Sequence, residues 1–270
     1  MSCCQRQATL FSPPLKTQAQ VVDLTSFRER LIRGDLLLGT IVSLATPQIM
    51  EILTQAGFDW LFIDAEHAPL DDGDIQLLIQ AAGATPCLVR IPCLDEIAIK
   101  KALDAGAVGI IVPQVNNAEQ AALAVSYAKY PPWGQRGVGI SRAHGYGFGF
   151  QEYLNRANEE VVVVVQAEHA VAADNIEAIV ATPGIDAVFI GPYDLSASFG
   201  KMGQIEDVLV IDAVERINSA CLSAGIKLGV FGTSSEAVMP YIERGHTLIA
   251  AATDTLLLGQ SARDLLARLN

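Results

Sequence analysis

The run V-V-V-V-V-Q-A-E at residues 161–168 predicts a strand that is buried on both faces and ends in a charge. A strand with one face in water alternates apolar and polar residues, whereas five consecutive valines are typical of the fully covered strands of parallel sheets. Successive side chains point to opposite faces, so Gln166 and Glu168 share one face at the carboxyl end of the strand. A buried charge without a partner is costly, and we therefore expect Glu168 to have a strong partner there.

The same order of elements recurs along the chain: a short apolar run, a polar turn, an Ala- and Leu-rich stretch with helical spacing, and a glycine. The predicted strands are 39–44, 60–64, 86–90, 109–113, 161–166, 187–190, 227–231 and 247–252. Parallel strands need crossover connections, which the intervening helices supply. Eight such units in 270 residues favour an α/β fold of the (β/α)8 TIM-barrel type over an open doubly wound sheet.

One barrel domain is expected over residues 23–270, after a loose tail over residues 1–22. The tail has two cysteines, adjacent prolines and scattered glutamines, and it lacks the apolar core of a secretory signal. Ser26 and Glu29 form an S-x-x-E capping box, which predicts a helix that ends at Arg33.

Charge and hydropathy exclude two classes of protein. Lys and Arg total 18 against 30 Asp and Glu, and the net charge of -12 repels nucleic acids. Although 51% of the residues are hydrophobic, the uninterrupted apolar runs are far shorter than the ~18 to 20 residues that cross a bilayer, so a membrane protein is not expected. Five cysteines without a C-x-x-C pair indicate thiols in a reducing, cytoplasmic compartment.

Glycines crowd residues 137–149, in the longest gap between predicted strands. Neither a G-x-G-x-x-G that joins a strand to a helix nor a G-x-x-x-x-G-K-[ST] is present, so NAD and ATP binding are not indicated. Functional insertions commonly occupy long loops, and we predict that this segment is a flexible active-site loop.

Polar side chains follow several predicted strands, at the end where barrels carry their active sites. Glu168 and Asp194 come from consecutive strands, and two carboxylates without Cys or a required His suit a hard cation such as Mg²⁺ or Mn²⁺. A carboxylate pair held by salt bridges is the alternative. Arg90 ends an apolar strand, where its permanently charged fork would lie beside bound oxygen anions, and a structural ion pair is the alternative.

A histidine follows two carboxylates after the second predicted strand, in the order Asp64, Glu66, His67. A neighbouring carboxylate orients an imidazole and tunes its basicity for proton transfer near neutral pH. His67 is therefore the candidate acid/base, with simple packing or capping as the alternative. Asp254, after the last predicted strand, adds one more carboxylate to this end of the barrel.

Six motifs, in order, resemble the HpcH/HpaI aldolase family, which consists of metal-dependent 2-oxo acid aldolases similar to 4-hydroxy-2-oxoheptane-1,7-dioate aldolase. The motifs are DAEHAPLD at 64–71, VRIP at 89–92, LDAGA at 103–107, YPPWGQRGVG at 130–139, QAE at 166–168 and FIGPYDLS at 189–196. The resemblance implies a TIM barrel of the phosphoenolpyruvate/pyruvate-binding type. It also implies cleavage of a 4-hydroxy-2-oxo acid to pyruvate and an aldehyde, or the reverse.

The resemblance implies a role for each residue that matches a family motif. Glu168 and Asp194 would hold the metal, with Mg²⁺, Mn²⁺ or Co²⁺ as the ion. Arg90 would support the 2-oxo oxygen and the enolate formed from it. His67, assisted by Asp64, would act through a water as the acid/base.

Substrate contacts are assigned to Gln166, Tyr193 and Asp194. Gln166 matches a glutamine that lines the family's pocket. Tyr193 stands where the family usually has a small residue, and it would narrow the pocket or offer a hydroxyl to the acceptor. Relatives also include enzymes that build citrate from oxaloacetate or decarboxylate it, so an oxaloacetate-using carbon–carbon bond enzyme is the alternative function.

Two rival functions come from other classes. A lysine Schiff-base aldolase would need Lys227, which lies at the start of its predicted strand and therefore at the wrong end of the barrel. A non-catalytic barrel that binds small acids is the second rival, and metal-dependent pyruvate release would eliminate it.

The family assembles as hexamers, as trimers of dimers, in which the last helix packs against a neighbouring subunit. Leu265, Leu266 and Leu269 give residues 261–269 an apolar stripe that suits such a contact. Packing of this helix on its own barrel is the alternative.

Overall fold

The computed structural model describes residues 26–269. The tail expected over residues 1–22 lies outside the described residues, as does the predicted start of the domain at residue 23.

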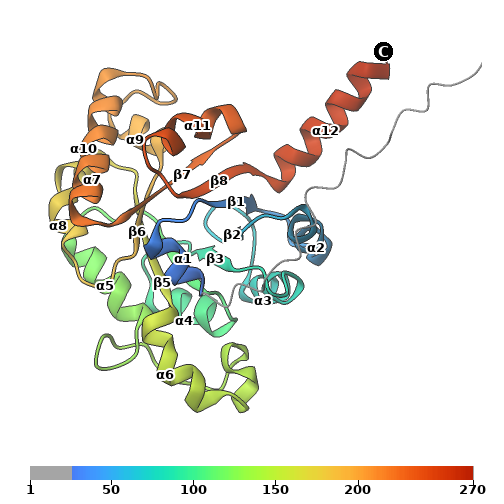
Figure 1. Ribbon diagram of the computed structural model, residues 1–270, viewed down its shortest axis with the longest axis vertical. Coiled ribbons are helices and arrows are strands. Elements are labelled where there is room, and N and C mark those ends of the chain that lie inside the picture. The colour runs from blue at the N-terminus through green and yellow to red at the C-terminus, as the bar shows by residue number, and fades with distance from the viewer. Residues whose placement is uncertain (1–25, 270) are drawn as a thin grey trace, which may run out of the picture.

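Eight parallel strands close into a barrel in which each strand pairs with the next and β8 pairs with β1 (Figure 1). The strands are β1 Leu37–Val42, β2 Trp60–Asp64, β3 Cys87–Arg90, β4 Gly109–Val112, β5 Val162–Ala167, β6 Ala187–Ile190, β7 Lys227–Gly232 and β8 Leu248–Thr253. All eight predicted strands are confirmed, with small shifts at their ends. β5 ends at Ala167, so Glu168 stands just beyond it.

Helices precede, separate and follow the strands, and most of these helices cover the outer face of the barrel. They are α1 Phe27–Arg33, α2 Pro47–Ala56, α3 Asp72–Ala81, α4 Glu96–Asp104, α5 Ala118–Ala128, α6 Phe150–Glu160, α7 Ala170–Asp174, α8 Ile176–Val180, α9 Pro192–Ser198, α10 Val208–Ala224, α11 Ser235–Glu243 and α12 Asp254–Leu269, with a 3₁₀ segment η1 at Arg142–Gly147. Across residues 26–269, none of these helices combines the length and the apolar character that crossing a bilayer requires.

The five-valine run reflects two separate cores. Val163 and Val165 belong to the core between barrel and helices, whereas Val162 and Val164 belong to the core inside the barrel. Every position of β5 is buried, because alternate side chains enter alternate cores. Gln166 continues the inward series, as its spacing predicts.

Helix α1 closes the amino-terminal end of the barrel. Ser26 caps it through the predicted capping box with Glu29. Phe27 and Leu31 pack into the inner core of the barrel. Arg28 pairs with the buried Asp186 at 2.7 Å. Helix α1 thereby fills the amino-terminal end of the barrel, so a cavity inside the barrel can open only at the carboxyl ends of the strands.

The glycine-rich segment 137–149 lies at the amino-terminal end of the strands, so its prediction as an active-site loop of this barrel is wrong. Buried Arg136, just before it, pairs with Asp104 at 2.6 Å, and Arg142 donates to the carbonyl of Ala105 at 2.9 Å. Asp104 and Ala105 end α4, just before β4 begins. The segment follows α5, which has already returned the chain to the amino-terminal end of the barrel. The length of the gap between the predicted strands does not indicate at which end of the barrel the segment lies.

The last helix, α12, projects away from the barrel in Figure 1. Its first residue, Asp254, is 2% exposed, whereas Leu265, Leu266 and Leu269 are 60%, 60% and 75% exposed. Packing of this apolar stripe on its own barrel, the alternative considered above, is therefore wrong.

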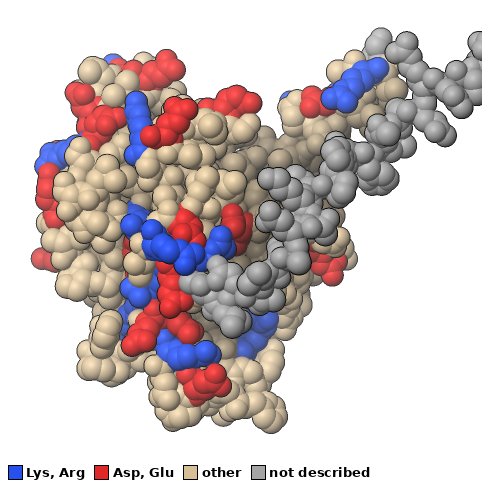
Figure 2. Space-filling view, in the orientation of Figure 1, with Lys and Arg blue, Asp and Glu red and all other residues tan. Residues whose placement is uncertain are grey.

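Charged side chains are interleaved over the surface. Figure 2 shows, on the face in view, Lys and Arg set beside Asp and Glu rather than gathered into a basic patch. Measured pairs include Arg30–Asp59 at 2.8 Å and Arg244–Glu215 at 2.6 Å.

A buried histidine predicts how stability depends on pH. His246, 1% exposed, donates from Nε2 to Asn218 Oδ1 at 2.9 Å, and burial lowers its pKa from 6.5 to about 4. Protonation therefore favours the unfolded chain, and the stabilisation is complete above pH 6.5 and is lost as the pH falls towards 4.

We expect urea unfolding of the wild type to lose roughly 2 kcal/mol more stability between pH 7 and pH 5 than unfolding of His246→Gln, which has no imidazole to titrate. The difference between the two proteins removes the contribution of all other groups. Equal losses in both would contradict the assignment.

Candidate functional site

A cavity of about 390 Å³ opens at the carboxyl ends of the strands. Its walls include six of the seven residues predicted from sequence: Asp64, His67, Arg90, Gln166, Tyr193 and Asp194. The seventh, Glu168, is buried behind the wall at 3% exposure. Apolar side chains of the inner core, among them Phe62 and Phe189, form the floor.

Arg90 and Asp64 form a paired fork at the ends of β3 and β2. These residues are register partners, and Arg90 donates from Nε to Oδ1 at 2.9 Å and from Nη2 to Oδ2 at 2.7 Å. The guanidinium lies over the Phe62 ring at 5.2 Å. Arg90 is thus ion-paired, as the structural alternative supposed, and it also lines the cavity, so its charge is held rigidly beside the space for a ligand.

His67 lies at the rim of the cavity, with 66% of its side chain exposed. Its Nε2 is 3.6 Å from Glu66 Oε2, whereas Asp64 accepts a hydrogen bond from the backbone N–H of His67 at 3.3 Å. The carboxylate that faces the imidazole is therefore that of Glu66. Asp64 instead positions the turn that carries the histidine.

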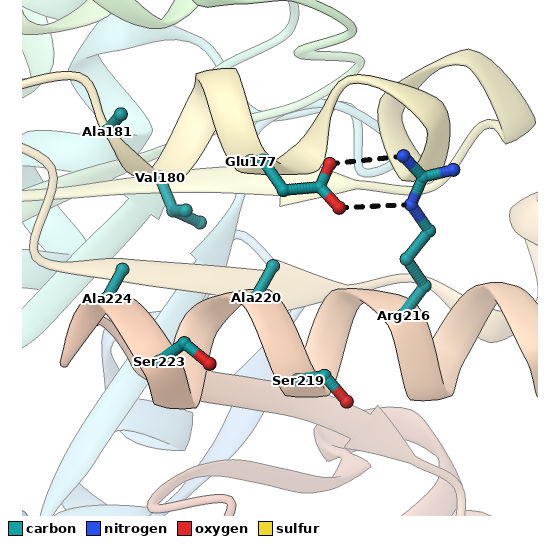
Figure 3. A pocket seen from close by; sticks show the side chains of 8 residues that line it. All are labelled: Glu177, Val180, Ala181, Arg216, Ser219, Ala220, Ser223 and Ala224. Atoms are coloured by element: carbon teal, nitrogen blue, oxygen red, sulfur yellow. Dashed lines mark hydrogen bonds and ion pairs between the residues drawn. The ribbon is translucent and has the colours of Figure 1, made fainter.

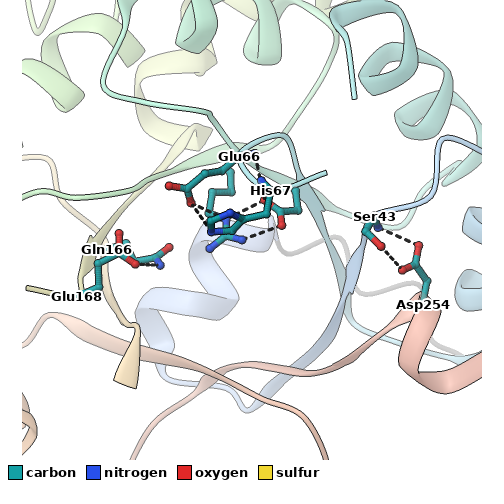
Figure 4. A network of polar contacts seen from close by, with 8 residues as sticks. Ser43, Glu66, His67, Gln166, Glu168 and Asp254 are labelled. Carbon is teal, nitrogen blue, oxygen red and sulfur yellow. Dashed lines mark hydrogen bonds and ion pairs between the residues drawn. The ribbon is translucent and has the colours of Figure 1, made fainter. Parts of the chain in front are cut away.

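Glu66 is the site residue to which the sequence analysis gave no role of its own. Its Oε2 lies 3.2 Å from Arg90 Nε, is buried, and accepts no hydrogen bond from residues 26–269 (Figure 4). Burial raises the pKa of Glu66, and the charges of Asp64 and Asp194 raise it further. The period of two residues from Asp64 was the signal that could have placed it on the same face.

Glu168 is held by two amide donors. Its Oε1 accepts from the backbone N–H of Gln114 at 2.9 Å, and its Oε2 accepts from Gln166 Nε2. Gln114 adopts a φ of 54°, a left-handed conformation that is unfavourable for a residue with a side chain. Burial raises the pKa of Glu168 to about 7, and the charges of Glu66 and Asp194 add to the effect.

These carboxylates fit a divalent cation. Asp194 lies in the first turn of helix α9 and lines the cavity, and its charge acts on both Glu66 and Glu168. Oxygen donors of this kind suit Mg²⁺ or Mn²⁺. Within residues 26–269, no group of three or more His, Cys, Asp and Glu side chains is arranged to hold a metal.

Gly191 gives Glu168 the room that it occupies. A Cβ at Gly191 would lie 2.9 Å from both Cβ and Oε2 of Glu168 and 3.3 Å from Gln166 Nε2. The first two distances are shorter than side chains tolerate. The glycine of the G-P-Y-D motif is therefore required by the approach of β6 to the buried carboxylate.

A second hollow, on the outside of the barrel, offers no such convergence. It lies between α8 and α10 and is lined mainly by alanine and serine side chains, with a pair between Arg216 Nη2 and Glu177 Oε2 at 3.1 Å (Figure 3). Lys227, the candidate for a Schiff base, lines a small hollow with Gly34 and Gly245 at the amino-terminal end of the barrel. Its distance from the carboxyl-end cavity disfavours a Schiff-base mechanism, as its place in the strand predicts.

A closed parallel barrel of eight strands with alternating helices is the architecture of the phosphoenolpyruvate/pyruvate-binding aldolases. A family model described as HpcH/HpaI aldolase/citrate lyase matches residues 38–260. The chain belongs to this family and is an aldolase, a carbon–carbon lyase. Substrates of the family are 2-oxo acids and aldehydes.

Individual relatives cover nearly the whole chain. A 4-hydroxy-2-oxovalerate aldolase from Rhodococcus jostii is 39% identical over 253 residues, which are 91% of this chain and 96% of the relative. A 2-dehydro-3,6-dideoxy-6-sulfogluconate aldolase from Pseudomonas putida is 40% identical over 240 residues, or 86% and 92% of the two chains. The crystal structure of a family protein from Burkholderia cenocepacia is similar with a TM-score of 0.85 at 37% identity, covering 90% of this chain and 98% of that one.

Gly191→Ala should weaken Mn²⁺ binding roughly tenfold or more, because the added Cβ displaces the Glu168 carboxylate. Isothermal titration calorimetry of the folded variant measures the change. Gly259→Ala in α12 is the matched control, since nothing lies within 4 Å of a Cβ there. Wild-type Mn²⁺ affinity in a natively folded Gly191→Ala protein would remove Glu168 from the metal site.

Proposed function

We propose that this protein is a divalent-metal-dependent aldolase that cleaves a 4-hydroxy-2-oxo acid to pyruvate and an aldehyde, and forms it in reverse. The observation that carries the proposal is the buried Glu168 carboxylate beside the cavity that Arg90 and Asp194 line. Relatives named as 4-hydroxy-2-oxovalerate aldolase and hydroxypyruvate/pyruvate aldolase support the substrate class.

Glu168 and Asp194 would hold the cation, with Mg²⁺ or Mn²⁺ preferred and Co²⁺ as a further candidate. When bound, such an ion supplies a Lewis acid for the carboxylate and 2-oxo oxygens of the substrate. Gln166 donates a hydrogen bond from Nε2 to Glu168 Oε2, and its own buried Oε1 has no hydrogen-bond partner in residues 26–269. Gln166 would therefore contact both the substrate and Glu168, the residue proposed to bind the metal.

Arg90 would stabilise the enolate oxygen that develops during cleavage. The bond between C3 and C4 breaks, its electrons form a double bond between C2 and C3, and the electron pair of the C2 carbonyl moves onto the oxygen, which becomes negatively charged. Asp64 holds the guanidinium at two points, so the positive charge need not reorganise when the enolate forms. Protonation of C3 then gives pyruvate.

His67 would accept the proton of the C4 hydroxyl, through a water, and return it in the synthetic direction. Its exposed position at the rim leaves room for that water. Glu66, 3.6 Å from the ring, would steady the imidazole when it carries the proton. Tyr193, 59% exposed at the lip of the cavity, would limit the size of the aldehyde.

The function is tested by pyruvate release from a panel of 4-hydroxy-2-oxo acids, with oxaloacetate as a further substrate, in Mg²⁺, Mn²⁺ or Co²⁺ and after chelation. The proposal expects release that chelation abolishes and the metal restores. Chelator-resistant cleavage with borohydride trapping of pyruvate would instead indicate a Schiff base. Turnover of oxaloacetate alone would assign the alternative function.

Arg90→Lys should lower kcat by roughly 10² or more, because it keeps a positive charge but loses the fork that Asp64 orients. The lysine avoids leaving Asp64 as an isolated buried charge. Arg216→Lys, in the outer hollow, is the control and should retain wild-type turnover. Near-normal kcat in Arg90→Lys would contradict the assignment.

We propose, further, that the enzyme is a cytoplasmic homo-oligomer, a hexamer built as a trimer of dimers. The exposed leucines of α12 support an intersubunit contact, since apolar side chains at 60% to 75% exposure are covered favourably by another chain. The free thiols of Cys87, Cys93 and Cys221 agree with a reducing compartment.

The double variant Leu265→Asp/Leu269→Asp should sediment as a smaller species than the wild type in analytical ultracentrifugation, because each Asp adds a charge to the proposed contact. Its circular dichroism should be unchanged. A wild type that is already monomeric, or a variant of unaltered mass, would contradict the role of α12.

A further inference from the structure

The wall of the cavity that faces away from the metal ligands has no role in the mechanism above. Residues of the ends of β1, β7 and β8 form it: Ile41, Ser43, Phe231, Thr233 and Thr253. Figure 4 shows Ser43 and Asp254 across the barrel mouth from Gln166 and Glu168, with Glu66 and His67 between them. If pyruvate occupies the metal side, as the proposed function requires, the aldehyde part of the substrate faces this wall.

A bulge at the end of β8 brings Asp254 to this wall. Gly39 pairs with Ala250 but Ile41 pairs with Thr253, so β8 carries one extra residue. Ala252, within the bulge, has a φ of 59°, and its carbonyl accepts a hydrogen bond from the buried Thr40 hydroxyl at 3.1 Å. A left-handed alanine is unfavourable, and it persists where the surrounding structure enforces it, commonly at functional sites.

Asp254 fixes both the backbone and the hydroxyl of Ser43. The carboxylate, 2% exposed, accepts from Ser43 N at 2.8 Å and from Leu44 N at 2.9 Å through Oδ2. Through Oδ1 it accepts from Ser43 Oγ at 2.7 Å and from Thr255 N at 2.8 Å. The hydroxyl hydrogen of Ser43 is therefore engaged, and the lone pairs of Oγ remain for a ligand.

The other hydroxyls of this side are less suited to recognition. Thr253 is bonded to the Thr255 hydroxyl at 2.8 Å and accepts from Leu256 N at 3.1 Å, as part of the start of α12. Thr233 and Tyr193 are exposed at the lip. Ser43 is thus the cavity-lining hydroxyl that a buried carboxylate holds in one orientation.

We propose that Ser43 Oγ accepts a hydrogen bond from a hydroxyl group of the acceptor aldehyde, and that Asp254 is the positioning residue that makes Ser43 an acceptor. The substrate class is an uncharged short aldehyde with a hydroxyl next to the carbonyl. An oxygen that can only accept favours a donor, and the carboxylate behind it disfavours an anionic group. This inference rests on the proposed function.

The test compares glycolaldehyde with acetaldehyde, which differ by one hydroxyl, in aldol addition to pyruvate by the metal-loaded enzyme. Ser43→Ala should lower kcat/KM for glycolaldehyde roughly fivefold to tenfold, the scale of one net hydrogen bond, and change that for acetaldehyde less than about twofold. Asp254→Asn should also lower the ratio of kcat/KM for glycolaldehyde to that for acetaldehyde. The asparagine amide can donate a hydrogen bond to Ser43 Oγ, so the serine hydroxyl is no longer held as an acceptor. Ser219→Ala, exposed on α10, is the control.

Exchange of the pyruvate methyl hydrogens with D₂O, monitored by NMR in the absence of aldehyde, distinguishes failure of the proposed function from failure of the role of Ser43. It involves only the pyruvate half, and it should be unchanged in Ser43→Ala and Asp254→Asn. Normal exchange with an unaltered glycolaldehyde-to-acetaldehyde ratio in both variants would overturn the role of Ser43 alone. A wild type without metal-dependent exchange would overturn the proposed function and this inference together.

Discussion

Burial of the Glu168 carboxylate is the constraint on which the site depends. A charge at 3% exposure beside two further carboxylates is unfavourable, and the raised pKa of about 7 expresses that cost. The chain accommodates it through a left-handed Gln114, an amide from Gln166 and a glycine at 191. Such an arrangement is useful when a doubly charged ion balances the carboxylates and receives substrate oxygens.

The barrel separates structural from chemical polar groups. At its amino-terminal end, buried charges are paired for stability, as in Arg28–Asp186 and Arg136–Asp104. At its carboxyl end, Arg90 is rigidly paired yet still lines the cavity. Two of the three non-glycine residues with positive φ in residues 26–269, Gln114 and Ala252, also follow or end strands there. Backbone strain and the candidate site therefore coincide at this end.

Much of the fold could be predicted from sequence because its signals are local. The five-valine run, the capping box at Ser26 and the eight recurring units each specify an element directly, and the strand ends then place Glu168, Arg90 and Asp194 at one mouth. Features that depend on tertiary geometry could not be predicted from the sequence. The end at which segment 137–149 lies depends on the direction of α5, and the proximity of Glu66 to Arg90 and His67 depends on how the turn after β2 folds. The bond between Ser43 and Asp254 needs the closure of β8 on β1.

The most direct test of the account is an anomalous difference map from a crystal grown with excess Mn²⁺ and pyruvate. A Mn²⁺ peak is expected within ligand distance of one oxygen each of Glu168 and Asp194, with pyruvate bound beside Arg90. A map without a peak between these two carboxylates, although both Mn²⁺ and pyruvate are present in excess, would contradict this binding site.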